Sequence, residues 1–194
     1  FFKGEPMNII VSTDNQHKLK EIRELVEGKC HVLSKTEAGF GDIHPVEDGD
    51  SLEENAVIKI KPLQGEVVIG DDTGLFVHAL DGRPGVYSAR YAGEDGNDEK
   101  NREKLLREMK DKTDRRAYFK TVIAVKCGDD IYSVEGVCPG RITETARGEG
   151  GFGYDPLFVP EGYEKTFAEM TDDEKNAVSH RGRALRAFVE SLGL

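Results

Sequence analysis

Two adjacent carboxylates are the groups in this chain whose type and placement best suit chemistry. Asp71 and Asp72 follow the apolar run 67–69 and lie within the acidic segment 70–74, which begins and ends with glycine. Buried strands of α/β sheets commonly carry catalytic groups at their carboxyl ends. Carboxylate oxygens also suit a hard cation such as Mg²⁺, which takes one or two carboxylates together with substrate phosphates and water. Taken alone, however, the segment is more typical of a solvated acidic turn.

A second acid for such a site could come from a cluster of carboxylates earlier in the chain. These acids lie at the predicted start of a helix and are Glu47, Asp48, Asp50, Glu53 and Glu54. Acids are also expected there for structural reasons, because a helix N-terminus favours negative charge and Glu54 can form a capping box with Ser51. Spacing alone leaves the choice among them open.

A polar loop between the first predicted strand and the first predicted helix offers donors for phosphate oxygens. Its sequence over residues 12–18, Ser-Thr-Asp-Asn-Gln-His-Lys, supplies hydroxyl, amide and ammonium groups. The free N–H groups and the dipole of a helix N-terminus attract phosphate. An ordinary capped loop would carry similar residues, and the chain contains no Gly-x-x-x-x-Gly-Lys-Ser/Thr phosphate loop.

A glycine-rich stretch over residues 148–153 could contact a nucleobase. It matches Gly-x-Gly-x-x-Gly, but Pro156 shortly afterwards disfavours the helix that a dinucleotide fingerprint requires. We interpret the stretch as an open loop in which Phe152 and Tyr154 line a pocket and stack on a base. Two core aromatics in a tight turn fit the same residues equally well.

The composition excludes several classes of protein. The chain has 194 residues, enough for one sizeable core, and its net charge of −10 disfavours nucleic acid, whose binding depends on a basic surface. No apolar run approaches the ~20 residues of a membrane span, and no signal peptide is visible, so we expect a cytoplasmic protein without membrane contact. Three scattered cysteines lack the spacing of a disulfide framework or a zinc knuckle.

Hydrophobic periodicity and turn residues predict an alternation of strands and helices. The expected elements are a strand over 8–12, a helix over 18–27, a helix from Ser51 to Pro62, strands over 67–69 and 75–80, a helix from about 97 to 110, a hairpin of 117–127 with 131–137, and a last helical region after a Thr171–Glu174 capping box. This pattern predicts a single α/β domain over residues 7–194. Its twisted sheet would be mixed, flanked by helices, and antiparallel in the hairpin portion.

Taken together, five stretches resemble the inosine triphosphate pyrophosphatase family, also called Ham1-like. They occur in the family's order at residues 12–18, 70–75, 84–91, 150–156 and 174–181. The match spans nearly the whole chain from Met7. Residues 1–6 precede the usual start of the family and are expected to be an artificial extension or a variant N-terminus.

The resemblance implies a role for each matching residue. Glu47 and Asp72 would bind Mg²⁺, for which Mn²⁺ could substitute, and Asp72 would also act as the general base. Residues implied to bind substrate are Thr13, Asn15 and Lys18 at the triphosphate, Thr73 on the nucleotide, and Phe152, Gly153, Tyr154, Asp155, Lys175, His180 and Arg181 at the base and sugar. The role of Asp71 stays open, either orienting the site or capping the turn.

The function implied by the resemblance is hydrolysis of noncanonical purine nucleoside triphosphates. ITP, dITP or XTP would be cut to the monophosphate and pyrophosphate by a homodimer. One alternative is a phosphatase with an aspartyl nucleophile, but its Asp-x-Asp motif does not match the adjacent acids Asp71 and Asp72. A nucleotide-binding regulator without turnover is the other alternative, and the complete set of acids argues against it.

Overall fold

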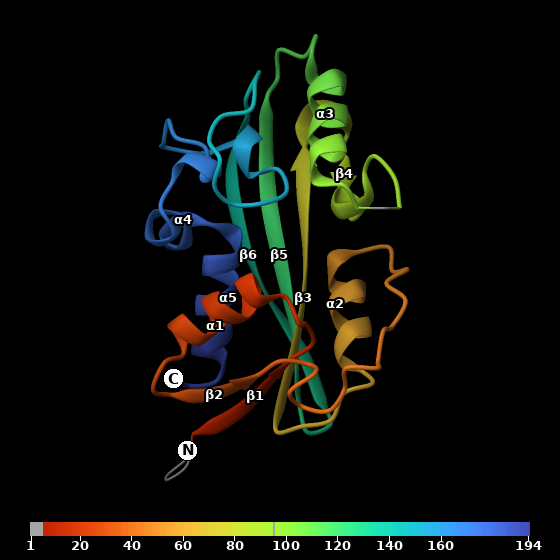
Figure 1. Ribbon diagram of the computed structural model, residues 1–194, viewed down its shortest axis with the longest axis vertical. Coiled ribbons are helices and arrows are strands. Elements are labelled where there is room, and N and C mark those ends of the chain that lie inside the picture. The colour runs from red at the N-terminus through yellow and green to blue at the C-terminus, as the bar shows by residue number, and fades with distance from the viewer. Residues whose placement is uncertain (1–5, 95) are drawn as a thin grey trace. The chain divides into compact units, whose positions relative to one another are not determined.

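The computed structural model describes residues 6–94 and 96–194. The predicted N-terminal extension therefore lies, except for Pro6, outside the described residues. The strands are β1 Met7–Val11, β2 Cys30–Leu33, β3 Val67–Val77, β4 Pro84–Gly85, β5 Arg116–Cys127, β6 Asp130–Ile142 and β7 Phe158–Pro160. The α-helices are α1 Gln16–Leu25, α2 Leu52–Ile60, α3 Asp98–Met109, α4 Asp172–Val178 and α5 His180–Ser191 (Figure 1).

The strands form a mixed sheet, which confirms the predicted α/β class. Within the described residues the sheet has seven strands, in the order β2-β1-β3-β5-β6-β7, with β4 paired to β3. β1 is parallel to both β2 and β3, whereas β4 and β7 pair antiparallel to their neighbours. A short Gly128-Asp129 connection joins β5 and β6, as the sequence predicts for a hairpin.

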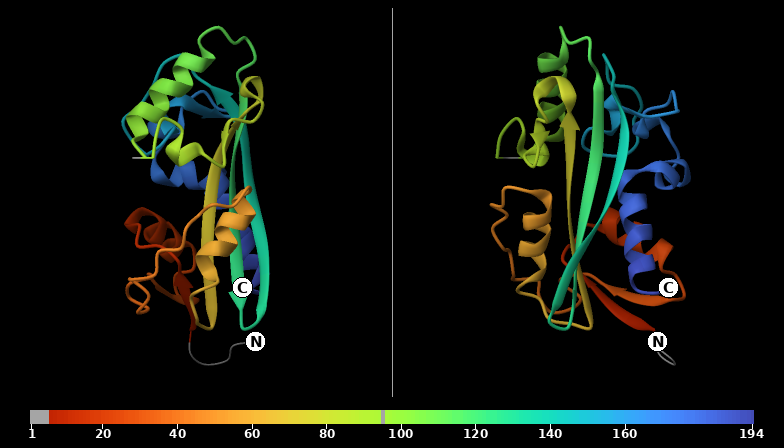
Figure 2. Two further views of the ribbon diagram at one scale, coloured as in Figure 1. Left: turned by 90° about the vertical axis from the view of Figure 1, so that its right-hand side faces the viewer. Right: turned by 180° about the vertical axis from the view of Figure 1, so that it is seen from behind.

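Close contacts divide the described chain into two compact units, and the prediction of one domain over residues 7–194 stays a prediction. The first unit takes the described residues up to Asp72 together with Val122–Glu135 and Ala184–Leu194. Apolar side chains of β1, α1, β3, β5 and α5 form its core, among them Ile9, Leu19, Ile69, Ile123 and Phe188. The last turns of α5, in blue in Figure 2, contribute Leu185 and Phe188 to this core.

The second unit consists of Thr73–Thr121, residue 95 apart, and Gly136–Arg183. Its core joins the end of β3 to α3, β5, β6 and β7 through side chains that include Leu75, Leu105, Met109, Phe119 and Phe158. The rings of Phe119 and Phe158 meet edge to face with their centroids 4.6 Å apart.

The predicted acidic turn over residues 70–74 is wrong, because β3 runs without a break from Val67 to Val77. Gly70 does not form a turn, and it permits close packing between β3 and α2. A Cβ atom there would lie 2.9 Å from Ile60 Cγ2 and 3.1 Å from Lys59 Cβ, so its absence lets α2 approach the strand. The prediction failed because glycine and aspartate are ordinary turn residues when only the sequence is considered.

Other boundaries are largely as predicted. The strand expected over 75–80 ends at Val77, and a 3₁₀ turn, His78–Leu80, follows it. The last helical region is divided at Ser179, where α4 ends and α5 begins. The Thr171–Glu174 capping box is confirmed in both directions.

The capping box predicted at the start of α2 is only half formed. The Ser51 hydroxyl accepts from the Glu54 backbone N–H as expected, but the Glu54 carboxylate accepts from the backbone N–H of Asp50. Among the described residues, no helix is both long enough and apolar enough to cross a membrane.

Candidate active site

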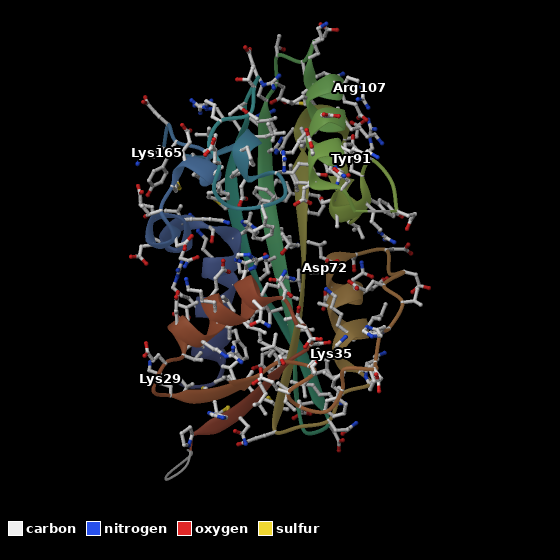
Figure 3. All side chains as sticks on the ribbon, viewed as in Figure 1. Lys29, Lys35, Asp72, Tyr91, Arg107 and Lys165 are labelled. Atoms are coloured by element: carbon white, nitrogen blue, oxygen red, sulfur yellow. The ribbon has the colours of Figure 1, made fainter. Side chains whose placement is uncertain are left out.

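The two neighbouring carboxylates of β3 have different partners. Asp71 Oδ1 accepts a hydrogen bond of 3.0 Å from the Lys18 ammonium of α1. Asp72 Oδ2 accepts one of 3.1 Å from the Asn55 side-chain amide of α2. Successive side chains of a strand point to opposite faces, so a continuous β3 directs these two acids apart. Figure 3 labels Asp72 on this strand.

A lysine of α2, Lys59, connects the acids from different segments. Its ammonium lies 3.1 Å from Glu47 Oε1 and donates a hydrogen bond of 2.5 Å to the backbone oxygen of Asp71. The close approach of α2 at Gly70 brings the lysine stem against the strand. We call Lys18, Glu47, Asn55, Lys59, Asp71 and Asp72 the acidic cluster.

Charge and burial compete within the acidic cluster. Burial lowers the pKa of Lys59, but the charges of the three nearby carboxylates outweigh it and hold the pKa above its ordinary value. Burial raises the pKa of Asp72, against the opposing effects of Lys59 and the Asn55 hydrogen bond. The cluster therefore keeps a cation among acids in a partly desolvated place.

The loop that carries Glu47 is attached on both sides of this residue. Before it, the buried Lys35 donates a hydrogen bond of 2.8 Å to the backbone oxygen of Ile43. After it, the backbone N–H of Gly49 donates to the Asn55 side-chain oxygen at 2.8 Å. Asn55 thus contacts Asp72 with its amide nitrogen and holds the Glu47 loop with its amide oxygen.

The predicted phosphate loop caps α1. The Asn15 side-chain oxygen accepts from the backbone N–H groups of His17 and Lys18, and Thr13 Oγ1 accepts from the Asn15 N–H at 3.1 Å. Asn15 is therefore the N-cap of α1, and Lys18 extends from the first turn of this helix to Asp71. The loop brings the α1 N-terminus and the acidic cluster together within the first unit.

The donor chemistry of the acidic cluster suits a hard divalent cation. Glu47, Asp71 and Asp72 offer oxygen atoms alone, and the Lys59 ammonium already lies among them. Mg²⁺ is commonly held by one or two carboxylates together with substrate phosphates. Within residues 6–94 and 96–194, no group of three or more His, Cys, Asp or Glu side chains is arranged to hold a metal ion.

In the second unit, the segment 148–156, here called the glycine loop, is organised around a buried ion pair. The Lys175 ammonium lies 2.7 Å from Asp155 Oδ2, which also accepts from the backbone N–H of Phe152. Gly151 is required beside this carboxylate, because a Cβ atom there would overlap it. The Lys175 ammonium lies 4.9 Å from the centroid of the Phe152 ring, at cation–π distance.

The remaining predicted base-site residues lie around this loop. His180 stacks on Phe119 with ring centroids 4.5 Å apart, and the Arg181 guanidinium carbon lies 5.3 Å from the Phe152 centroid. The Tyr154 side chain belongs to the apolar core, and its hydroxyl donates to the backbone oxygen of Ser88 at 2.6 Å.

The Thr73 hydroxyl forms a hydrogen bond of 2.8 Å with the hydroxyl of Thr121, on the neighbouring strand β5. The contact that the family resemblance implies between Thr73 and the nucleotide stays a prediction.

Two residues of the acidic cluster, Asn55 and Lys59, are not among the site residues predicted from the sequence. Both lie on the face of α2 that also buries Ala56 and Ile60, four residues apart along the helix. The signal that could have revealed them is a polar pair at i and i+4 within an otherwise apolar helical face.

Fold and acidic cluster together define an α/β protein in which carboxylates and lysines gather around β3 beside the N-terminus of α1. The chain belongs to the Ham1 family, whose model matches residues 9–191. This confirms the resemblance to Ham1-like proteins that the sequence motifs indicate.

Individual relatives cover nearly the full length. The dITP/XTP pyrophosphatase of Christiangramia forsetii is 46% identical over 190 residues, which are 96% of this chain and 99% of that protein. The dITP/XTP pyrophosphatase of Clostridium perfringens is 49% identical over 196 residues, covering 94% and 96%. The solved structure of the Ham1 protein of Staphylococcus aureus has a TM-score of 0.85 at 40% identity and covers 95% of this chain and 98% of that one.

Proposed function

We propose that this chain hydrolyses ITP, dITP and XTP to the nucleoside monophosphate and pyrophosphate, and so removes these nucleotides from the cellular pool. The acidic cluster carries the proposal, because it combines carboxylates, lysines and a helix N-terminus around β3. Relatives of 41–49% identity that are named dITP/XTP pyrophosphatase support the choice of substrate.

The lysines and the α1 N-terminus bind the triphosphate in this proposal. Lys18 and Lys59 carry positive charge next to acids that they can leave for phosphate oxygens, since both ion pairs are partly exposed. Thr13 and Asn15 form the loop at the helix N-terminus, whose free N–H groups and dipole favour phosphate. The positive charge of the two lysines and of the helix N-terminus stabilises the negative charge that develops on the leaving pyrophosphate.

Asp72 is the proposed general base. Its carboxylate takes a proton from water while the water oxygen bonds to the α-phosphorus, and the bond from that phosphorus to the bridging oxygen breaks. The electron pair leaves with pyrophosphate. Asn55 orients Asp72 through its hydrogen bond of 3.1 Å. A Mg²⁺ ion held by Glu47 and Asp72, or Mn²⁺ in its place, would supply Lewis-acid charge stabilisation.

Residues of the second unit are proposed to select the base. His180 and Arg181 are our candidates for contacts with a 6-oxo purine, together with Phe152 and the Asp155–Lys175 pair. A polar group left unpaired by the adenine amino group costs ~1–3 kcal/mol, which disfavours ATP. A substitution of His180 or Arg181 that leaves the ITP-to-ATP preference unchanged would contradict this assignment.

The assembly and location are also proposals. A homodimer is expected from the family resemblance, and size-exclusion chromatography with light scattering measures it directly. We place the activity in the cytoplasm because nucleoside triphosphates are made and used there. Fractionation of cells that express the native chain tests the location.

One assay tests the proposed reaction. The protein is incubated separately with ITP and ATP, with Mg²⁺ or with EDTA, and both pyrophosphate and phosphate are measured. We expect pyrophosphate from ITP with Mg²⁺ and little product with ATP or with EDTA. Release of phosphate would indicate a phosphatase instead, and binding of ITP without any product would indicate a regulator.

A further inference from the structure

One residue of the glycine loop, Gly153, is held through both of its backbone polar groups by side chains of α3. The Gly153 N–H donates a hydrogen bond of 3.0 Å to Asp98 Oδ2. The Gly153 oxygen accepts one of 2.8 Å from Arg102 Nη1. Asp98 and Arg102 are four residues apart and therefore share one face of the helix. We call this pair the α3 clamp.

The residues on either side of Gly153 contact Lys175, so the α3 clamp also affects their positions. Phe152 precedes Gly153 and is 41% exposed, and the Lys175 ammonium lies over the Phe152 ring. Asp155 follows two residues later and pairs with Lys175. Movement of the Gly153 peptide would therefore shift the exposed ring relative to the cations beside it.

The helix that provides the clamp is itself well fixed. The Asn97 side chain caps its N-terminus by accepting from the Lys100 N–H at 2.9 Å. The buried Asn101 donates to the Ala89 oxygen at 2.9 Å and accepts from the Ala92 N–H at 2.7 Å. A peptide held by such a helix keeps one position, which a selective binding surface requires.

We propose that Asp98 and Arg102 are positioning residues for base selection, which hold the glycine loop so that Phe152 is presented to a purine ring. This inference rests on the proposed function, because it assigns the exposed ring to the base of the nucleotide. Asp98 and Arg102 belong to the second unit, whereas every member of the acidic cluster belongs to the first. Their loss is therefore expected to weaken binding and selectivity more than turnover.

The test compares variants of the clamp with matched variants of the same helix. Asp98→Ala removes the acceptor and Arg102→Met removes the donor, whereas Asp98→Asn and Arg102→Lys keep an acceptor and a donor. The controls are Glu99→Ala, a first-turn acid, and Arg107→Met, an exposed arginine labelled on α3 in Figure 3. Initial rates with ITP and ATP give kcat and KM for each protein.

We expect each clamp-breaking variant to raise KM for ITP about tenfold, equivalent to ~1.4 kcal/mol of binding, with kcat within about threefold of the wild type. We also expect the clamp-breaking variants to lose part of the preference for ITP over ATP. The conservative variants should recover most of the KM and most of the preference, and the controls should leave both KM and preference unchanged. Unchanged KM and preference overturn the proposal. So does a fall in kcat of equal size for ITP and ATP, since that outcome indicates a general structural role.

Hydrogen–deuterium exchange separates this inference from the proposed function. The peptide that contains residues 148–156 should exchange faster in Asp98→Ala and Arg102→Met than in the wild type and both controls, because Gly153 loses its partner groups. Unchanged exchange overturns the clamp even if the enzyme is active. A wild type that releases no pyrophosphate from ITP overturns the proposed function and the base-selection role together, while exchange still reports whether the clamp orders the loop.

Discussion

The acidic cluster and the glycine loop both contain ion pairs, but they differ in burial. In the acidic cluster the side chain of Glu47 is 43% exposed beside Lys59 at 16%, and Lys18 and Asp71 are 19% and 16% exposed. In the glycine loop the pair of Lys175 and Asp155 is only 11% and 6% exposed. Glu47 is the member of these pairs that water, ions or phosphate can reach most readily.

Because of this difference in burial, charged groups of the acidic cluster can change partners, whereas those of the glycine loop stay paired. Because the Glu47 carboxylate is open to solvent, Lys59 can exchange it for a phosphate oxygen at lower cost than a member of a buried pair can change partners. A buried pair that loses one member leaves an uncompensated charge in a poorly solvated place. In the proposed function the acidic cluster binds and releases a charged ligand, whereas the buried pair holds the glycine loop in one conformation.

The largest expected effect is on stability in the second unit. Lys175→Met should lower the free energy of unfolding by ~3–5 kcal/mol, because it leaves Asp155 buried without its cation. Urea titration followed by circular dichroism measures this. The matched control is Lys165→Met, which breaks the exposed Lys165–Glu174 pair and should leave the free energy of unfolding close to that of the wild type. An equal loss of unfolding free energy in the two variants would contradict the idea that the buried pair stabilises its region more than an exposed pair does.

The next effect is on turnover in the first unit. Asp72→Asn should lower kcat for ITP by at least ~100-fold, the low end of general-base contributions, while the protein stays folded. Pyrophosphate release and a circular dichroism spectrum are measured on the same sample. Turnover close to that of the wild type would remove Asp72 from the mechanism.

A smaller loss of turnover is expected from the lysine that connects the acids. Lys59→Met should lower kcat/KM about tenfold, because one charge-assisted contact with phosphate is worth at least ~1.4 kcal/mol. Lys61→Met, which changes an exposed lysine two residues later, is the control and should have no effect. If both variants keep full activity, the Lys59 ammonium serves only to neutralise the carboxylates.

The smallest effect concerns the helix that carries Lys175. Thr171→Ala removes one half of the α4 capping box and should cost ~1 kcal/mol of stability, with Thr113→Ala, an exposed threonine outside any helix, as the control. Thermal unfolding measures both. A loss as large as that of Lys175→Met would mean that the cap, and not the ion pair, determines the stability of this region.

Local signals in the sequence were sufficient for much of the fold. Ser51 and Thr171 were recognised as helix caps because capping depends on residues three apart in the chain. The hairpin was recognised because its turn residues lie between two apolar runs. The roles of Lys59 and Asn55 do not follow from the sequence, because a polar residue on a helix acquires a role only through the strand that it packs against.

For the adjacent acids of β3, the sequence determines the kind of chemical group and the tertiary structure determines the contacts of each group. Asp71 and Asp72 were identified from the sequence as carboxylates at the end of an apolar strand, within a set of motifs in a family's order. Only the tertiary structure showed that the strand continues through them, so that alternation directs Asp71 to Lys18 and Asp72 to Asn55. Residue types determine which chemistry is available, but partners 17 and 53 residues away are selected by packing.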